Sequence, residues 1–168
     1  MTLTTRAMID ADLPWVLERV SREEVARMLF YDGPPADMAA LLAALSRTEP
    51  GTRTAPLVFL HQGQPVGFAE ISDIHPVHRK GTVALLAADR GHGLGCLRAT
   101  LRHGFAALNL HRLEARCFPD NNAIQVLASR LGARHEGTAR RQVWRNGTYS
   151  DVMQFAILAD DWRMKNAG

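Results

Sequence analysis

The feature that most constrains this chain is a set of alternating glycines, Gly91, Gly93 and Gly95, between two segments of different character. The segment before them, Thr82–Ala87, is apolar in all but its first residue, which predicts a strand in the middle of a sheet. After the glycines, apolar residues recur at helical spacing and predict a helix with one apolar face. These residues are Leu94, Leu97, Leu101, Phe105 and Leu108.

Glycines at the start of a helix indicate an anion site for a physical reason. The backbone amides of the first turn have no partner within the helix, and the helix dipole adds partial positive charge there. Because glycine lets a ligand approach these amides closely, the arrangement suits phosphate groups. The same glycines can also serve only as a tight turn between a strand and a helix.

Two common phosphate-binding loops are excluded. The Walker loop needs a Gly-Lys-Ser/Thr sequence, which is missing here. The dinucleotide fingerprint needs a wider glycine spacing and a parallel βαβ unit with an acidic residue about twenty positions on. Glu114 lies near that distance, but the pattern around it is not that of a doubly wound sheet.

Length and composition indicate one folded domain over residues 1–168. The chain is 46% hydrophobic, and its apolar residues are spread along the whole length, which is enough for a core. Its two cysteines, Cys96 and Cys117, fit no disulfide framework or zinc motif, so we expect both in the core. The sequence has no apolar run of membrane-spanning length, and its first residues do not resemble a signal peptide, so we expect a cytoplasmic protein.

The net charge of +3 is unevenly distributed. The first half of the chain is slightly acidic, and the basic excess lies in the half that holds the glycines. This suits an anionic ligand. The excess is too mild and scattered to indicate nucleic acid, and we expect neither a nucleic-acid nor a membrane partner.

The order of the remaining elements predicts an α/β protein around a mixed, mostly antiparallel sheet with flanking helices. Two turns, at 62–64 and at Asn146-Gly147, predict hairpins. A helix at Asn121–Leu131 should end at Gly132. Other expected elements are a strand near the N-terminus, helices at 14–20, 21–30 and 36–47, and a strand at Arg112–Phe118. For the early helices, Asp10 or Asp12 is a candidate N-cap, and Ser21 with Glu24 has the spacing of a capping box.

The sequence resembles the acetyl-CoA-dependent N-acetyltransferases called GNAT. Residues 90–95, RGHGLG, match the family signature Arg/Gln-x-x-Gly-x-Gly/Ala. Residues 113–137 resemble the family's strand, Asn-bearing turn, helix and Leu-Gly step. REEVARML at 22–29 and the tail at 145–158 are similar to the branch that includes the ribosomal-protein N-terminal acetyltransferases. The resemblance covers nearly the whole chain.

This resemblance implies a twisted sheet split by a V-shaped gap between its fourth and fifth strands, here Thr82–Ala87 and Arg112–Phe118. The pantetheine arm of acetyl-CoA is expected to pair with the backbone of Val83, Ala84 and Leu85, and its pyrophosphate to rest on the amides of Gly91 to Cys96. Asn121 is expected to bridge the cofactor, to cap its helix, or to do both. The cofactor-binding residues so implied are Val83, Ala84, Leu85, Arg90, Gly91, His92, Gly93, Leu94, Gly95, Cys96 and Asn121.

Acetyl transfer to an amine needs a deprotonated nucleophile, a polarised thioester carbonyl and a proton for the leaving thiolate. The family usually supplies that proton from a tyrosine whose position here is Ala128. Ser129 is adjacent and is a candidate to bind the thiolate directly or through water, or else it is an ordinary surface residue. Tyr149 is a more distant candidate.

Glu114 is the first candidate for the base, because it matches a Leu-Glu-x-Arg pattern that serves this role in some N-terminal acetyltransferases. Its alternative role is a salt bridge with Arg112 or Arg116. Glu70, on a strand expected to face the acceptor, is the second candidate. His75 and His78 are spaced like metal ligands, but the sequence offers no third ligand at a usual spacing, so we expect no metal site.

The predicted function is transfer of an acetyl group from acetyl-CoA to a primary amine by direct attack in a ternary complex. The acceptor is a protein N-terminus or a small-molecule amine. The alternative is a CoA-binding sensor or regulatory protein with weak or lost catalysis, which the alanine at position 128 favours. A homodimer formed through the closing hairpin is a further expectation of the resemblance.

Overall fold

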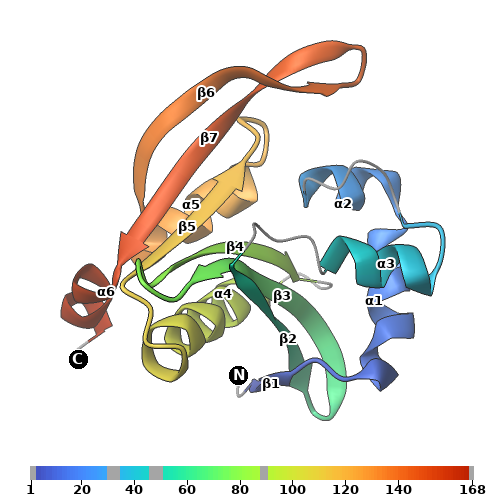
Figure 1. The fold of residues 1–168 in the computed structure, drawn as a ribbon, viewed down its shortest axis with the longest axis horizontal. Helices are drawn as coiled ribbons and strands as arrows, with labels where there is room; N and C mark the ends of the chain where they lie inside the picture. Colours follow the sequence, from blue (N-terminus) through green and yellow to red (C-terminus); the bar gives the residue numbers. More distant parts are fainter. Residues whose placement is uncertain (1–2, 30–34, 46–50, 88–90, 167–168) are drawn as a thin grey trace.

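The fold is a twisted seven-stranded sheet with helices on both faces (Figure 1). We describe it from a computed structural model, which covers residues 3–29, 35–45, 51–87 and 91–166. The strand order is β1-β2-β3-β4-β5-β7-β6, and all neighbours are antiparallel except β4 and β5. The strands are β1 Thr4–Ala7, β2 Arg53–His61, β3 Gln64–His75, β4 Lys80–Ala87, β5 Arg112–Cys117, β6 Arg134–Arg145 and β7 Thr148–Leu158. The predicted mixed, mostly antiparallel sheet is confirmed.

Helices from the two halves of the chain cover opposite faces of the sheet. The helical segments are η1 Asp10–Asp12, α1 Leu13–Val20, α2 Glu23–Met28, α3 Met38–Leu45, α4 Gly93–Arg102, the π-helical turn η2 His103–Ala107, α5 Asn122–Leu131 and α6 Ala159–Asn166. Phe68 of β3 packs against α1 and α3, whereas Ile71 of the same strand packs against α4. None of the described helices is long and apolar enough to cross a membrane, and the cytoplasmic location stays a prediction.

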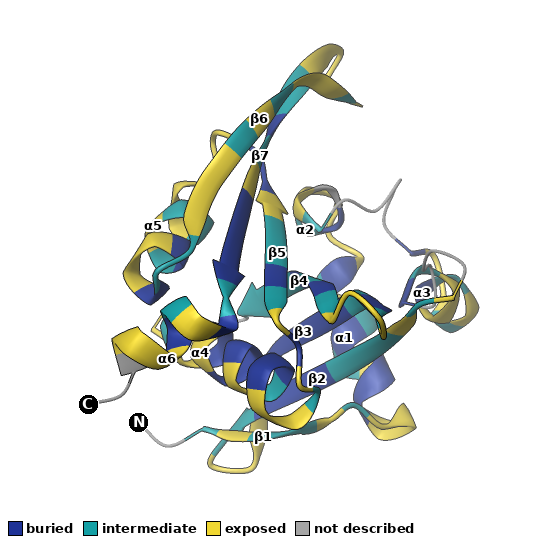
Figure 2. Cartoon of the chain, turned by 60° about the vertical axis from the view of Figure 1, so that its left-hand side comes forward, coloured by how far each residue is buried: buried dark blue, intermediate teal, exposed yellow. Residues whose placement is uncertain are grey.

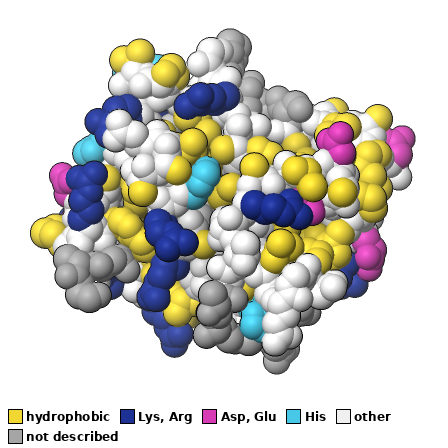
Figure 3. Space-filling model, turned by 90° about the horizontal axis from the view of Figure 1, so that it is seen from below, with side chains coloured by type: hydrophobic (Ala, Val, Ile, Leu, Met, Phe, Trp, Pro, Cys, Tyr) yellow, Lys and Arg dark blue, Asp and Glu magenta, His cyan; other side chains and the backbone are white. Residues whose placement is uncertain are grey.

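Charge is also divided across the molecule. In the face seen in Figure 3, most Lys and Arg side chains lie at the left and centre, and most Asp and Glu side chains lie at the right. The right of that view is the side on which α1 lies in Figure 1. The uneven charge along the sequence therefore becomes an uneven charge in space.

Local turn chemistry fixes both predicted hairpins. Gln62-Gly63 and Asn146-Gly147 have positive φ at both residues, the conformation that matches the twist of a two-residue hairpin. The β6–β7 hairpin projects from the body, and β6 is largely exposed (Figure 2). The expected pairing of two copies through this hairpin stays a prediction.

The ends of α5 follow the sequence prediction, whereas the early caps do not. The Asn121 side chain accepts a hydrogen bond from the Ile124 amide (3.3 Å), and Gly132 ends the helix with a φ of 92°. In contrast, the Ser21 hydroxyl donates to the carbonyl oxygen of Leu17 (2.7 Å) at the end of α1. The predicted capping box is therefore wrong, because Ser21 closes one helix rather than opening the next.

The one parallel strand pair parts after a short register. β4 pairs with β5 from Lys80 opposite Arg112 to Val83 opposite Ala115. β4 then continues to Ala87, while β5 stays paired with β7 as far as Cys117. The two strands therefore diverge beyond Val83, as the predicted V-shaped gap requires.

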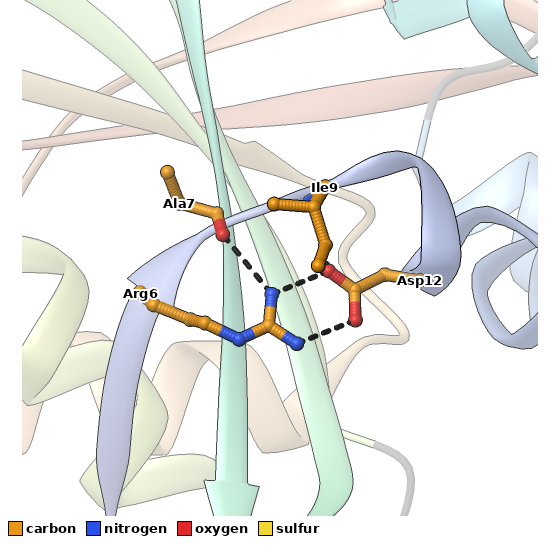
Figure 4. Close-up of polar contacts among 4 residues, drawn as sticks. All are labelled: Arg6, Ala7, Ile9 and Asp12. Atoms are coloured by element: carbon orange, nitrogen blue, oxygen red, sulfur yellow. Dashed lines mark hydrogen bonds and ion pairs between the residues drawn. The ribbon is translucent and has the colours of Figure 1, made fainter.

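An ion pair ties the first strand to the first helix (Figure 4). The Arg6 guanidinium donates to both carboxylate oxygens of Asp12, at 2.5 and 2.7 Å, and the Ile9 amide donates to the same carboxylate at 2.9 Å. Asp12 is buried, and α1 has no side-chain cap hydrogen bond, so the prediction that Asp10 or Asp12 caps α1 is wrong. The hydrogen bonds from Arg6 lower the pKa of Asp12 below its usual value, against the effect of burial.

We expect Asp12→Asn to lower the free energy of unfolding by about 1–3 kcal/mol at neutral pH, because the charged hydrogen bonds to Arg6 are lost. A carboxyl whose folded pKa is lowered stabilises the fold above its unfolded pKa of about 4, and this contribution is lost as the pH falls through the folded pKa. The difference from the parent should therefore shrink towards about pH 2. Urea titrations across this range measure it. Asp160→Asn, at an exposed i,i+3 pair with Arg163, is the control with little expected change. A loss that is equal at both ends of the range would contradict the assignment.

Candidate active site

The parting of β4 and β5 opens into a cavity of about 1000 Å³. Its two sides come from different helices, and in Figure 1 α5 and α2 flank the space above β4 from opposite sides. On one side, α4 and α5 contribute Leu94, Leu97, Leu101, Ile124, Leu127 and Leu131. On the other side, α2 contributes Val25 and Met28, the residue after it is Leu29, and α3 contributes Ala44. One continuous space therefore reaches both faces of the sheet through the gap.

The glycine segment places the start of α4 at this cavity. Gly91 has a φ of +100°, a conformation that favours glycine, and Gly93 is the first residue of the helix. Gly91, Gly93 and Leu94 all line the cavity. A Cβ at Gly93 would lie 3.1 Å from Cδ1 of Leu127, so this glycine lets the start of α4 lie close against α5 at the wall of the cavity.

The other residues of the segment face elsewhere. A Cβ at Gly95 would lie 2.8 Å from Cδ1 of Leu3, so this glycine serves packing against the N-terminal segment. The Cys96 amide already donates to the carbonyl oxygen of His92, which leaves the earlier amides of the turn as the candidate anion ligands. Cys96 is fully buried, as predicted for both cysteines, and burial raises the pKa of its thiol to about 11.

The two remaining residues of the segment are His92 and Arg90. The His92 ring is buried away from the cavity, with its centroid 5.3 Å from that of His61. Neither nitrogen of the His92 ring has a hydrogen-bond partner in the described part of the chain. Arg90, which was expected to bind the cofactor, lies outside the described residues.

The edge of β4 and the start of α5 form the rest of the predicted cofactor side. Val83, Ala84 and Leu85 line the cavity where β4 no longer pairs with β5. Asn121 and Asn122, at the start of α5, line it as well. Asn121 therefore caps the helix and also lies in the wall of the cavity where the cofactor is expected.

Glu70 is a buried carboxyl group in the wall of the cavity. It lies on β3 opposite Ala84 of β4, and only 6% of the residue is exposed. Burial, and to a smaller extent the charge of Asp73, raises the pKa of Glu70 to about 8. The carboxyl group is therefore poised to gain or lose a proton near neutral pH, which general acid–base chemistry requires.

Glu114 lies on the same face of the sheet but in a different environment. It is opposite Thr82 of β4, and 34% of its side chain is exposed. Its carboxylate accepts a hydrogen bond from Nε of Arg112 at 2.7 Å, while the other guanidinium nitrogens of Arg112 bind Glu136. Of the two roles foreseen for Glu114, the ion pair with Arg112 is therefore present in the structure.

The predicted proton donors are not brought to the cavity together. Ala128 is buried and lines it, but has no polar side chain. Ser129 is exposed and is not part of the lining, and Tyr149 is exposed on the β6–β7 hairpin, edge-on to Trp144. His75 and His78 stack on each other in the β3–β4 turn. Within the described ranges, no three or more metal-binding side chains form a group that could hold an ion.

The raised pKa of Glu70 gives a stability signature that is independent of activity. A carboxyl group with a folded pKa near 8 binds its proton more tightly when folded, so the parent loses stability as the pH rises from about 4.5 to 8. Glutamine does not titrate. We therefore expect Glu70→Gln to gain stability relative to the parent between about pH 5 and pH 9, as measured by thermal unfolding of the unliganded protein.

Glu136→Gln is the matched control, because the hydrogen bonds from Arg112 lower rather than raise the pKa of Glu136. Its difference from the parent should stay nearly constant over the same pH range. If the difference for Glu70→Gln is constant too, the Glu70 carboxyl is not held in its neutral form by the fold.

Comparison with known proteins identifies the family. Residues 2–134 match the family model of the acetyltransferase (GNAT) domain. The chain is 30% identical over 74 residues to the uncharacterized N-acetyltransferase YnaD of Bacillus subtilis, covering 44% of each chain. It is 25% identical over 107 residues to the putative ribosomal N-acetyltransferase YdaF of the same organism, covering 61% of this chain and 58% of the relative. The chain thus spans about half the length of the curated relatives it matches.

A solved structure agrees with the fold. The crystal structure of spermidine N-acetyltransferase from Vibrio cholerae in complex with CoA and spermine superposes with a TM-score of 0.84. The alignment covers 95% of this chain and 97% of that one, at 22% sequence identity. The resemblance stated from the sequence is confirmed, and the chain belongs to the GNAT acetyltransferase family.

Proposed function

We propose that this protein transfers the acetyl group of acetyl-CoA to a primary amine within a ternary complex, with Glu70 as the base. The observation that carries the proposal is the position of Glu70, a buried carboxyl with a pKa near 8 in a cavity that reaches both faces of the sheet. The two faces allow the cofactor and the amine to enter from opposite sides. Direct transfer requires such an arrangement, because both reactants must meet without an enzyme-bound intermediate.

The side formed by α4 and α5 suits the cofactor. The first amides of α4 offer hydrogen bonds and partial positive charge to the phosphates. Among the described residues, the β4 edge beyond Val83 has no strand partner on the β5 side, so its backbone is available to an extended pantetheine arm. The solved Vibrio cholerae neighbour is a complex with CoA, which supports the same cofactor here.

The reaction removes two protons from the ammonium nitrogen and exchanges a C–S bond for a C–N bond. The amine is largely protonated at neutral pH, and the ionised Glu70 carboxylate takes its proton directly or through a water molecule. The free nitrogen lone pair then forms the C–N bond at the thioester carbonyl, and the C–S bond breaks to leave the CoA thiolate. The second proton of the nitrogen is lost as the amide forms, and it neutralises the thiolate.

The alanine at position 128 removes the usual acid but not the support for the thiolate. A thiol is acidic enough, with a reference pKa of about 8.5, to leave without a strong acid. The start of α5, where Asn122 and Ala123 line the cavity, offers the partial positive charge of a helix N-terminus to the developing thiolate. Ser129 stays a candidate that would need water to reach it.

The alternative, a CoA-binding sensor without catalysis, rests on Ala128. It gives no reason for the buried carboxyl group of Glu70, which costs stability when it ionises. Release of free CoA thiol from acetyl-CoA in the presence of amines separates the two functions, because a sensor binds acetyl-CoA and releases none.

The cofactor site predicts an effect of Gly93→Val. The added side chain would enter the space between the start of α4 and Leu127, so we expect CoA affinity to fall at least about tenfold. Titration calorimetry measures the affinity, and circular dichroism confirms that the variant folds. Gly137→Val on β6, where a Cβ meets no atom within 4 Å, is the matched control. Unchanged affinity in a folded Gly93→Val would place the cofactor elsewhere.

The assignment of the base predicts that Glu70→Gln lowers turnover by about 10²–10⁴-fold while CoA affinity is retained. In the parent, kcat/KM should rise with pH through a pKa near 8, since the base acts in its ionised form, and this titration should be missing from the variant. Glu114→Gln tests the other candidate in the same assay. Glu136→Gln, which removes the neighbouring partner of Arg112 outside the cavity, is the control with parental turnover. If Glu114→Gln shows the large loss and Glu70→Gln does not, Glu114 is the base.

A further inference from the structure

We propose that the acceptor is a small primary amine carried on an apolar carbon skeleton, and that α2 and α3 select it against polyamines. This inference rests on the proposed function and adds the class of acceptor. It follows from which side of the cavity the amine enters, and from the side chains that it meets there.

The direction of entry follows from strand alternation. Side chains two apart on a strand share a face, so Glu70 lies on the same face as Phe68, which packs against α1 and α3. Val83 and Ile71 point to the opposite face, against α4. Because α4 carries the glycine segment, the cofactor occupies that side, and the amine reaches Glu70 from the side of α2 and α3.

The described wall on the amine's side is apolar. Its lining side chains in α2, in the residue that follows it and in α3 are Val25, Met28, Leu29 and Ala44. The acidic residues of α2, Glu23 and Glu24, are exposed and do not line it. Met28 is 49% exposed at the edge of the cavity, and methionine is a flexible side chain that adapts to apolar ligands.

Among the described residues, the carboxyl groups that line the cavity lie on the sheet and not on the helices. Glu70, Asp73 and Glu114 all belong to β3 or β5, where Arg112 pairs with Glu114 and Arg116 of β5 also lines the cavity. An amine therefore finds negative charge at its reacting end and apolar surface along its length. A second ammonium group placed against Val25 and Met28 would lose water without gaining a carboxylate, which is costly.

Two acceptors that differ in a single group test this directly. Hexylamine and 1,6-hexanediamine share a six-carbon chain, but the diamine carries a second ammonium group at its far end. We expect kcat/KM for hexylamine to exceed that for the diamine and for spermidine at least about tenfold, measured by release of CoA thiol. Phenethylamine should be accepted as well, because its ring replaces the alkyl chain against the same wall.

Met28→Glu places a carboxylate on the wall at a half-exposed position, where the fold should tolerate it. We expect the variant to lose activity with hexylamine and to gain activity with the diamine, so that the ratio of the two moves towards the diamine. Leu42→Glu is the matched control, because Leu42 is similarly exposed on α3 but does not line the cavity. Its ratio should equal that of the parent.

The outcomes separate this inference from the proposed function. If the parent acetylates spermidine or the diamine better than hexylamine, the apolar acceptor is wrong and the acetyltransferase stands. If a peptide with an N-terminal alanine far exceeds every small amine, the acceptor class is likewise wrong. If the protein binds CoA but no amine releases thiol from acetyl-CoA, the proposed function fails and this inference fails with it.

Discussion

The candidate site depends on the point at which two parallel strands stop pairing. β4 and β5 share four residue pairs and then separate, because β5 continues to follow β7 while β4 continues to follow β3. A sheet that loses a pairing exposes backbone groups that need other partners. The same separation opens a passage between the two faces of the sheet. The exposed edge of β4 beyond Val83 and the passage between the two faces of the sheet therefore have the same cause, the divergence of β4 from β5.

The two carboxyl groups beside this passage differ because of what surrounds them. Glu114 keeps about a third of its side chain in solvent and accepts a hydrogen bond from Arg112. Glu70 is buried, and burial together with the charge of Asp73 raises its pKa. Two residues of one chemical type on one face of the sheet thus lie in different environments. This contrast, rather than proximity to the gap, separates them as candidates for a proton acceptor.

The sequence predicts well those features that short segments determine by themselves. The turn at Asn146-Gly147, the cap at Asn121 and the αL residue Gly132 each depend on a few adjacent residues, and all are confirmed. The assignments of Ser21 and Asp12 were wrong because each side chain takes a partner on its N-terminal side: the Ser21 hydroxyl donates to the carbonyl oxygen of Leu17 in α1, and Asp12 binds Arg6 of β1. The ion pair of Arg112 with Glu114, two residues on, was one of the two roles foreseen from the sequence. The pair of Arg112 with Glu136 and the packing of Gly95 on Leu3 join distant segments, and spacing along the chain carries no signal for them.

In the proposed mechanism, the position of α5 compensates for the missing tyrosine at position 128. The helix begins at the cavity with Asn121 as its cap. The partial positive charge of the helix N-terminus is therefore at the cavity, and it does not depend on which residue stands at position 128. A tyrosine at position 128 would add a proton donor to this field, whereas Ala128 leaves the field alone and leaves room beside it. A thiolate needs less help than an alkoxide to leave, because its conjugate acid is stronger by several pKa units. In this proposal, activation of the amine is then the more demanding step, and it is the step assigned to the buried carboxyl group of Glu70.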